Sequence, residues 1–347
     1  MSADVTIFAN ARQVVTCAGP GAARRGTAMA DARIVTDVAV AMSGAEITGV
    51  GPLEELRASH HGATEIDCGD GVLTPGLVDS HTHAIFGRAR YEEQEYRAAG
   101  LDYMEIARRG GGIHASVRDL RGRSAAELET LGEQRLRRLA AHGVTTVEVK
   151  SGYGLSLEHE LMTLEVIQRL AKRLPMRIIP TFLGAHEIPL EHRGSTASRN
   201  AYIDELITAM LPAVANRKLA VFADVFCETG VYTVEESRRV LTAARARGLQ
   251  LKLHADELTS CGGAELAAEI GAISADHLAA VSGEGIRALA SVGTVATLLP
   301  GTMSFLGKMK QAPARALIEA GVPVALATDF NPGTSPTPNF PLVMSFA

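Results

Sequence analysis

The sequence predicts a mixed α/β protein in which a small β-rich domain precedes a parallel (β/α)8 barrel of the TIM type. After Leu73, eight apolar runs alternate with amphipathic helical stretches, which is typical of a parallel sheet covered by helices. Eight such units favour a closed barrel over an open sheet. Before Leu73 the apolar runs are short, and Gly, Pro and Asp separate them. We therefore predict two domains, residues 1–72 and residues 73–347.

The first domain is predicted from short β-type runs that suit a mostly antiparallel sheet. These runs cover residues 5–8, 13–16, 38–42 and 46–50. The segment 19–31 is rich in Gly, Ala and Arg and predicts a mobile loop. Residues 1–10 carry an early Asp4 and no long apolar stretch, so they do not resemble a signal peptide.

The second domain is predicted to hold the eight barrel strands and their helices. The strands are expected at residues 77–81, 144–150, 177–183, 219–226, 249–254, 272–277, 294–299 and 322–329. Helical periodicity is clearest at residues 124–142, 157–174, 234–247 and 311–320. In this fold the chemistry lies at the carboxyl ends of the strands.

Composition excludes several classes of protein. Hydrophobic residues make up 46% and charged residues 21%, which is typical of a soluble globular protein. The net charge of −5 argues against nucleic acid as the main partner. The four cysteines are scattered without a CxxC motif, which fits a reducing cytoplasm. No run approaches the length of a membrane span, so we expect a cytoplasmic protein with no membrane partner.

Two histidines, His81 and His83, end the first predicted strand. Side chains two positions apart on a strand share one face, so both imidazoles can reach one point. For an isolated His-x-His, a local capping role would be the better interpretation. Here His254, His277 and Asp329 also end apolar strands, the fifth, sixth and eighth. Three imidazoles and a carboxylate can fill a mononuclear zinc or iron site and leave a position for water.

The chain resembles the amidohydrolase superfamily, which are metal-dependent hydrolases with a (β/α)8 barrel beside a small β-sandwich. The segment His254-Ala255-Asp256-Glu257 is similar to that of cytosine deaminases and their relatives, in which the Glu moves protons. The resemblance is closer to the imidazolonepropionase family of histidine degradation. The segments that carry it are residues 110–113, 148–155, 182–186, 224–228 and 327–335.

The resemblance implies roles for individual residues and a reaction. It implies that His81, His83, His254 and Asp329 bind one zinc or iron ion. It implies that the substrate-binding residues are Arg90, Tyr153, His186, Glu257, Asn331, Gly333 and Thr334. The implied reaction adds water to 4-imidazolone-5-propanoate and opens the ring to N-formimino-L-glutamate. The partner is then a small molecule, and a homodimer is the family's expected assembly, while the sequence leaves zinc against iron open.

Physical chemistry supports two catalytic residues, each with an alternative. Glu257 lies just beyond His254 and is placed to take a proton from water and return it to the leaving nitrogen. The alternative is a surface carboxylate that opens the next helix. His277 can orient the water or polarise the substrate. Its alternative is a satisfied polar residue at a strand end.

The candidate substrate-binding residues also have simpler interpretations. Arg90 suits the propionate because a guanidinium binds a carboxylate through two parallel hydrogen bonds. From the sequence alone, a solvated arginine would be the better interpretation of Arg90. Tyr153 is equally well explained as a loop aromatic at the barrel rim, and His186 as a loop histidine in water.

Two further features argue against a second metal or a phosphate site. Lys150 ends the second strand, whereas relatives with a carboxylated lysine between two metals carry it on the fourth. We therefore expect Lys150 to be a structural ion-pair partner and the site to hold one metal. The run 108–112 lacks the spacing of a phosphate-binding loop and predicts an ordinary loop.

The chain ends at Ala347, soon after the eighth predicted strand, whereas the family continues further. We therefore expect the last barrel helix and the C-terminal strands of the sandwich to be missing, which would expose apolar surface. Two other functions stay open. One is deamination of a nucleobase-like ring, which would not need the cation of Arg90. The other is a non-catalytic barrel, which would not need four ligands together with Glu257.

Overall fold

The computed structural model describes residues 5–19, 21–101, 105–106 and 109–347. Parts of two predicted loops, at Pro20 and Arg108, lie outside the described residues. The chain divides into two compact units, one that ends at Gly76 and one that begins at Leu77. The sequence placed this boundary a few residues earlier, between residues 72 and 73.

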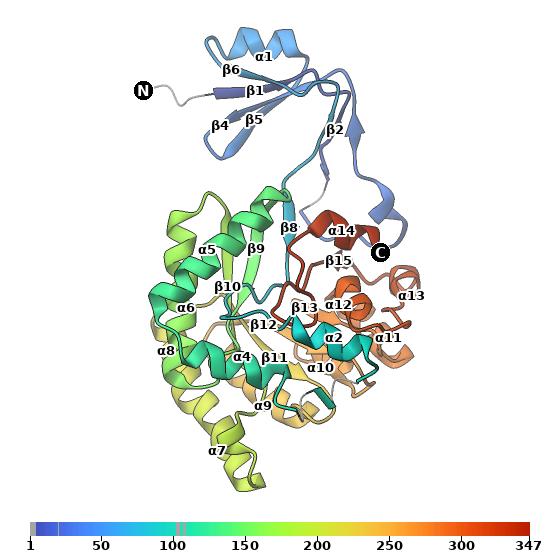
Figure 1. Ribbon diagram of the computed structural model, residues 1–347. Helices are drawn as coiled ribbons and strands as arrows, with labels where there is room; N and C mark the ends of the chain where they lie inside the picture. The colour runs from blue at the N-terminus through green and yellow to red at the C-terminus, as the bar shows by residue number, and fades with distance from the viewer. Residues whose placement is uncertain (1–4, 20, 102–104, 107–108) are drawn as a thin grey trace. The chain divides into compact units, whose positions relative to one another are not determined.

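The N-terminal unit contains two small sheets (Figure 1). The larger has the order β5-β4-β1-β6 and consists of β1 (Val5–Ala9), β4 (Ala39–Ser43), β5 (Glu46–Gly51) and β6 (Thr64–Asp67). The smaller consists of β2 (Gln13–Val15), β3 (Ile34–Val35) and β7 (Val72–Leu73). Helix α1 (Leu53–Ser59) places Leu56 against Ile7, Ala39 and Ala41 in a small core. The segment predicted as a loop contains a short 3-10 helix, Gly26–Ala30.

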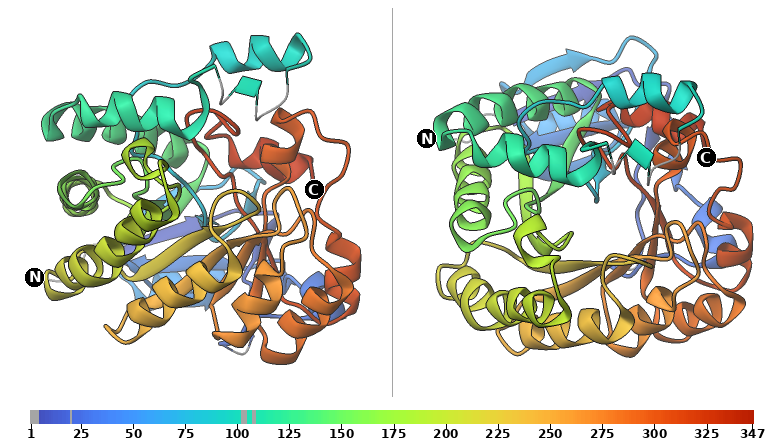
Figure 2. Two further views of the ribbon diagram at one scale, coloured as in Figure 1. Left: turned by 90° about the horizontal axis from the view of Figure 1, so that it is seen from below. Right: turned by 60° about the horizontal axis from the view of Figure 1, so that its bottom comes forward.

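The second unit is the predicted barrel, and its eight parallel strands follow one another in sequence order. They are β8 (Leu77–Asp79), β9 (Val144–Lys150), β10 (Arg177–Ala185), β11 (Phe222–Cys227), β12 (Gln250–Ala255), β13 (Ser274–His277), β14 (Val295–Leu298) and β15 (Val324–Leu326). Helices lie around the outside of these strands (Figure 2). The (β/α)8 prediction is therefore confirmed.

The barrel closes between its first and last strands without a regular ladder. A single parallel bridge joins Thr82 to Phe330, and the backbone N–H of Asp329 donates to the carbonyl of His81 at 3.0 Å. The Asp79 carboxylate accepts the backbone N–H of Thr328 at 3.0 Å and its hydroxyl at 2.6 Å. A side chain thus supplies the bonds that a backbone ladder supplies elsewhere in the barrel.

The helices of the barrel unit include both long outer helices and short turns. They are α2 (Glu92–Ala98), α4 (Gly112–Arg121), α5 (Ala125–Ala141), α6 (Leu157–Arg173), α7 (Thr196–Glu205), α8 (Leu211–Asn216), α9 (Val234–Arg245), α10 (Gly263–Glu269), α11 (Gly283–Val292), α12 (Pro300–Phe305), α13 (Ala314–Glu319) and α14 (Phe340–Ser345). A 3-10 turn at Leu190–His192 and a π-helix at Leu206–Met210 complete them. Among the described residues, none of the helices combines the length and the apolar character needed to cross a bilayer.

Local sequence explains where the long helices begin. At the start of α5, the Ser124 hydroxyl oxygen accepts the backbone N–H of Glu127, and the Glu127 carboxylate accepts the backbone N–H of Ser124. These two bonds form a capping box. Thr233 and Glu236 form the same arrangement at the start of α9. Helix α14 follows β15 and buries Phe340 and Val343 in the barrel core, and it is not among the helices predicted from the sequence.

Several predicted strands begin before the observed ones. The prediction assigns a whole apolar run to a strand, but apolar loop residues also pack into the core without pairing. Leu219 is buried in this way before β11 begins at Phe222. At the other end, β15 stops at Leu326, and Asp329 has a positive φ of 50° that a strand does not adopt.

The barrel interior contains a layer of buried charges, which we call the interior charge layer. It consists of Glu148 and Lys150 from β9, Asp224 from β11, Lys252 from β12 and Asp276 from β13. Lys150 Nζ donates to Glu148 at 2.7 Å and to Asp224 at 2.8 Å. Lys252 Nζ donates to the Ser80 carbonyl at 2.6 Å. The expected ion-pair role of Lys150 is confirmed.

Candidate active site

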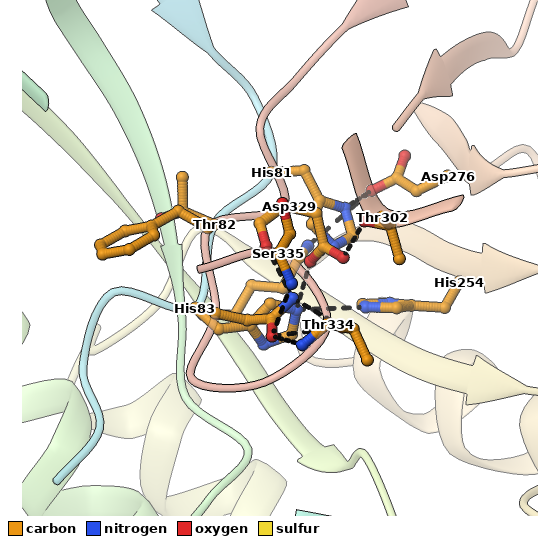
Figure 3. A network of polar contacts seen from close by, with 12 residues as sticks. His81, Thr82, His83, His254, Asp276, Thr302, Asp329, Thr334 and Ser335 are labelled. Atoms are coloured by element: carbon orange, nitrogen blue, oxygen red, sulfur yellow. Dashed lines mark hydrogen bonds and ion pairs between the residues drawn. The ribbon is translucent and has the colours of Figure 1, made fainter. Parts of the chain in front are cut away.

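The five residues predicted at the strand ends lie together at the carboxyl end of the barrel. His81 and His83 follow β8, His254 lies in β12, His277 ends β13 and Asp329 follows β15. All five are buried. Figure 3 shows His81, His83 and Asp329 turned toward one another, with His254 opposite.

Three of the distances between these side chains suit ligands of a metal ion, and His81, His83 and Asp329 have ligand atoms within 4.8 Å of one another. Asp329 Oδ1 lies 3.5 Å from both His81 Nε2 and His83 Nε2, and His83 Nε2 lies 3.4 Å from His254 Nε2. Ligand atoms around a tetrahedral zinc ion are about 3.4 Å apart when each bond is about 2.1 Å long. His81 Nε2 is buried and has no hydrogen-bond partner among the described residues. The residues present therefore fit a metal.

Two neighbouring imidazoles also approach this point. His277 groups with His81 and His254, and His186 groups with His83 and His254, each set having ligand atoms within 4.8 Å of one another. The His186 ring stacks on His83 with centroids 4.9 Å apart. The structure thus brings together every histidine and the aspartate that the sequence singled out for the centre.

The side chains behind the ligands were not identified from the sequence. Asp276 Oδ2 lies 2.6 Å from His81 Nδ1, and Asp224 Oδ2 lies 2.9 Å from His254 Nδ1. Thr302 donates its hydroxyl to Asp329 Oδ2 at 2.6 Å. Such partners orient metal ligands and fix which imidazole nitrogen is free. The available signal was an acidic residue within a predicted barrel strand, as in 219–226 and 272–277.

Electrostatics favour the uncharged form of the imidazoles. Burial is the main cause that lowers the pKa of His81, His83 and His277, and neighbouring cationic groups act in the same direction. Burial raises the pKa of Asp329 to about 6. Burial also acts to raise the pKa of Asp224, but His254 and Lys150 outweigh it and lower that pKa well below its usual value. Neutral imidazoles supply the lone pairs that a metal requires.

The backbone around the centre is strained. Asp256, His277, Leu278 and Asp329 have positive φ values of 50°, 78°, 61° and 50°. Non-glycine residues rarely adopt this region, and such strain gathers at functional sites. Each of these residues follows or ends a barrel strand, so the strain lies where the side chains turn into the site.

Glu257 lies beside His277, with Glu257 Oε2 3.5 Å from His277 Nδ1. The Glu257 side chain is buried, and burial raises the pKa of its carboxyl well above the usual value. The charges of Asp329 and Glu228 act in the same direction. Glu257 is therefore not a solvated carboxylate at the start of a helix.

A cavity in front of the cluster contains most of the predicted substrate-binding residues. Its walls include His83, Arg90, Tyr153, His186, Phe226, His254, Glu257, His277, Asp329, Asn331 and Thr334. Gly333 is not part of these walls. Instead it packs against Arg90, where an added Cβ would lie 2.0 Å from Arg90 Nη2.

Two buried side chains, Glu93 and Ser116, fix the guanidinium of Arg90. Its Nε donates to Glu93 at 2.7 Å and its Nη1 donates to the Ser116 hydroxyl at 2.5 Å. No hydrogen bond to a described residue is made by Arg90 Nη2, and the residue is only 5% exposed. Arg90 is thus a buried cation in the cavity wall rather than a solvated arginine.

The loops that carry the other wall residues are tied by buried polar groups. Asn331 Oδ1 accepts the backbone N–H groups of Gly333, Thr334 and Ser335, so most of its polar capacity is used within its own loop. The ring of Tyr153 lies 5.2 Å from that of His186. Burial lowers the pKa of His186 to about 3, so this imidazole is uncharged at neutral pH.

A second, larger cleft of about 910 Å³ adjoins the cavity. Glu257, Leu258 and Leu306 line both spaces. Arg97, Lys308 and Lys310 add cationic groups to the walls of the larger cleft. The buried centre therefore has a neighbouring space lined in part by positive charge.

Several known proteins have similar sequences or folds. The model of the amidohydrolase family matches residues 93–344. The imidazolonepropionase of Geobacillus kaustophilus is 49% identical over 97% of this chain and 80% of its own length. That of Bacillus velezensis is 46% identical over 99% of this chain and 80% of its own length.

Solved structures share the fold at lower identity. A zinc-containing adenosine deaminase from Xanthomonas campestris has a TM-score of 0.64 and 17% identity over 98% of this chain and 72% of its own. The ochratoxinase of A. niger has a TM-score of 0.66 and 16% identity over 99% of this chain and 79% of its own. These likenesses are to the fold alone.

Proposed function

The chain belongs to the imidazolonepropionase family of amidohydrolases, and from this we propose how its own residues carry out the family's reaction. It is a hydrolase of cyclic amide C–N bonds that acts on imidazolonepropionate in histidine degradation. Ring opening requires an activated water, a proton carrier and a group that holds the propionate. The cavity contains a candidate for each requirement.

For the metal we propose one ion per chain, zinc or iron, held by His81, His83, His254 and Asp329. Separations of 3.4 to 3.5 Å in three pairs of their ligand atoms, His81–Asp329, His83–Asp329 and His83–His254, support this set. When bound, such an ion acts as a Lewis acid that lowers the pKa of water and polarises a carbonyl. His277 is proposed to orient the water or the substrate carbonyl, since it lines the same cavity and lies beside His81 and His254.

Glu257 is proposed to move the proton. Its carboxylate faces His277 within the cavity, so it can take a proton from the attacking water. Burial raises the pKa of its carboxyl and so favours the protonated form, from which the proton passes to the leaving ring nitrogen. Donation of the proton to that nitrogen completes the cleavage of the C–N bond and restores the carboxylate.

Arg90 is proposed to bind the substrate propionate through Nη2. Its contacts with Glu93 and Ser116 fix the guanidinium plane before substrate arrives. Tyr153, His186, Asn331 and Thr334 form the walls around the ring, and Gly333 leaves the room that the Arg90 side chain needs. The observation that carries the proposal is a single cavity that joins the buried cation, the metal-type cluster and Glu257.

The experiment that tests this function is turnover of 4-imidazolone-5-propanoate, followed by the loss of its ultraviolet absorbance, together with metal analysis. We expect close to one zinc or iron per chain, and the loss of both metal and turnover in His81→Ala and Asp329→Ala. Two metals per chain, or turnover without metal, would overturn the proposed ligand set.

A second experiment tests Arg90. Arg90→Ala is expected to raise KM by an amount equivalent to about 2–4 kcal/mol, because a charged hydrogen-bonding partner is lost. Arg90→Lys should restore binding only in part, since it keeps the charge but not the planar fork. Arg88→Ala, in the same stretch but 68% exposed, is the matched control. If Arg90→Ala weakens an analogue without the propionate equally, Arg90 does not bind the carboxylate, and the deaminase alternative gains.

The setting of the enzyme is also a proposal. We propose a cytoplasmic homodimer whose partner is the small-molecule substrate, and the four cysteines, all free in the structure, support a reducing compartment. Residues 1–72 are proposed as one part of a composite β-sandwich. The exposed side chains of Ile47, Val50 and Ile66 on its larger sheet support this. Sedimentation of the purified protein and cell fractionation test the assembly and the compartment.

A further inference from the structure

The backbone on each side of Glu257 is held by a buried carboxylate. Asp256 precedes Glu257 and is fully buried, and Glu228 reaches the residues that follow Glu257. Glu228 comes directly after β11, so it belongs to a neighbouring strand end. These two acids do not line the catalytic cavity, and neither contacts a proposed metal ligand through a hydrogen bond of its side chain.

Asp256 is fixed by the start of α10. Its Oδ1 accepts the backbone N–H groups of Cys261, Gly262 and Gly263 at 2.9 to 3.1 Å. Its Oδ2 accepts the backbone N–H of Ala264 at 2.9 Å. Four donors on one buried carboxylate determine its orientation, and its φ of 50° turns the chain sharply just before Glu257.

Glu228 fixes the other side. Its Oε2 accepts the backbone N–H of Leu258 at 2.8 Å and that of Thr259 at 3.3 Å. Its Oε1 accepts the hydroxyl of Thr259 and the backbone N–H of Thr229, the latter at 2.8 Å. Glu228 is 3% exposed, so its carboxylate is largely shielded from water. The peptide unit directly after Glu257 is thus bonded to a different barrel strand.

We propose that Asp256 and Glu228 are positioning residues that together fix the Glu257 carboxylate at the distance from the reacting atoms that proton transfer requires. The inference rests on the proposed role of Glu257 and adds the reason why its side chain keeps one place. Displacement of a reacting group by about 1 Å can cost on the order of a hundredfold in rate. Two clamps on adjacent residues reduce such displacement, because neither neighbour can move without breaking buried charged hydrogen bonds.

The loop of Tyr153 contains a comparable clamp and provides a control. Glu160 is buried on α6, and its Oε1 accepts the backbone N–H groups of Gly154 and Leu155 at 2.8 and 2.9 Å. It holds a loop of the substrate wall and not the loop of Glu257. Glu160→Gln and Glu228→Gln therefore remove the same chemistry from two different loops.

The test measures kcat and KM separately in the metal-loaded enzyme. Glu228→Gln is expected to lower kcat by about tenfold to a hundredfold with KM changed by less than about threefold. Glu160→Gln is expected to change KM more than kcat. Thr259→Val, which removes one donor and keeps both acids, should show a smaller loss of kcat, and Thr259→Ser should restore it.

A double-mutant cycle distinguishes positioning from general stabilisation. If Glu228 acts through Glu257, Glu228→Gln should cost almost nothing further in kcat when Glu257 is already Gln. A full additional loss in that background, or an equal change of kcat and KM in Glu228→Gln, would overturn the positioning role. If Glu257→Gln alone retains a normal kcat, the proposed function of Glu257 fails instead. Thr259→Val keeps the inference testable if Glu228→Gln does not fold.

Discussion

The interior charge layer and the cluster at the strand ends lie in the same barrel but differ in how their polar groups are paired. In the layer, Lys150 pairs with Glu148 and Asp224, and Lys252 lies 3.2 Å from Asp276. In the cluster, both ring nitrogens of His277 and Nε2 of His81 have no hydrogen-bond partner among the described residues. Asp276 Oδ1 in the layer also has no such partner, but only in the cluster do several unpaired imidazole nitrogens gather at one point, as expected where a ligand binds.

The difference shows how the barrel supports its site. The layer has three carboxylates and two ammonium groups, which leaves one negative charge in excess. Asp224 and Asp276 direct that charge toward the Nδ1 atoms of His254 and His81. The carboxylates of the layer thus orient two imidazoles of the cluster. An acceptor at Nδ1 leaves Nε2 free for a metal.

The largest effect is expected from a substitution within the interior charge layer. Lys150→Met removes the ammonium that faces Glu148 and Asp224, so we expect unfolding free energy to fall by about 3–5 kcal/mol. Chemical denaturation of the metal-free protein measures this loss. Lys172→Met on the exposed side of α6 is the matched control and should change stability by less than about 0.5 kcal/mol. Equal effects of the two variants would remove the distinction between the layer and the surface.

Glu257→Gln tests the opposite behaviour in the cluster. We expect kcat to fall by roughly a hundredfold or more while fold and metal content are kept. A near-normal kcat would return Glu257 to an ordinary buried carboxyl. Glu158→Gln, exposed at the start of α6, controls for the loss of one charge.

The same variant also makes a prediction about pH. The folded pKa of Glu257 is raised, so folding of the metal-free parent binds this proton, and its stability is lost as pH rises above the unfolded value near 4.5. Glu257→Gln should therefore be at least as stable as the parent at neutral pH, and the difference should shrink as pH falls toward 4.5. A stability difference that grows on acidification would contradict the raised pKa.

Asp276→Asn sharpens the link between the two regions. The amide keeps the shape of the side chain but replaces the carboxylate oxygen that faces His81 Nδ1 at 2.6 Å. We expect metal affinity, measured by competition with a chelator, to fall by about tenfold to a hundredfold. Asp204→Asn at the exposed end of α7 should leave affinity unchanged. An unchanged affinity in Asp276→Asn would mean that the layer and the cluster act independently.

Thr302→Val gives the smallest expected effect. Thr302 donates one hydrogen bond to Asp329 Oδ2, and its loss is worth about 0.5–1.5 kcal/mol, or at most about tenfold in metal affinity. Thr302→Ser should retain the parent affinity. A loss as large as that of Asp276→Asn would place Thr302 among the main supports of the cluster.

The sequence predicted the barrel because apolar strands and amphipathic helices alternate regularly, and it brought His81, His254 and Asp329 to one edge by their place at strand ends. It did not identify Asp276 and Asp224 as partners of His81 and His254. A buried acid looks the same in sequence whether its partner is a lysine or a histidine. It also missed Glu228 and Asp256 as supports, since their partners are backbone N–H groups that have no signature in sequence. Small elements such as β3 and β7, Ile34–Val35 and Val72–Leu73, were too short to show periodicity.

The seam between β8 and β15 has a consequence for the order of events during synthesis and folding. Asp79 and Thr328 are 249 positions apart in the chain, and nearly the whole barrel must be made before they meet. Contacts of such separation form late and slowly, since the loop-closure entropy is lost before they form. His81 and Asp329 lie on opposite sides of this seam, so the proposed ligand set is complete only after closure. Tight metal binding is therefore expected only after the barrel has closed. A ribosome-bound chain that lacks its last strand should bind metal weakly.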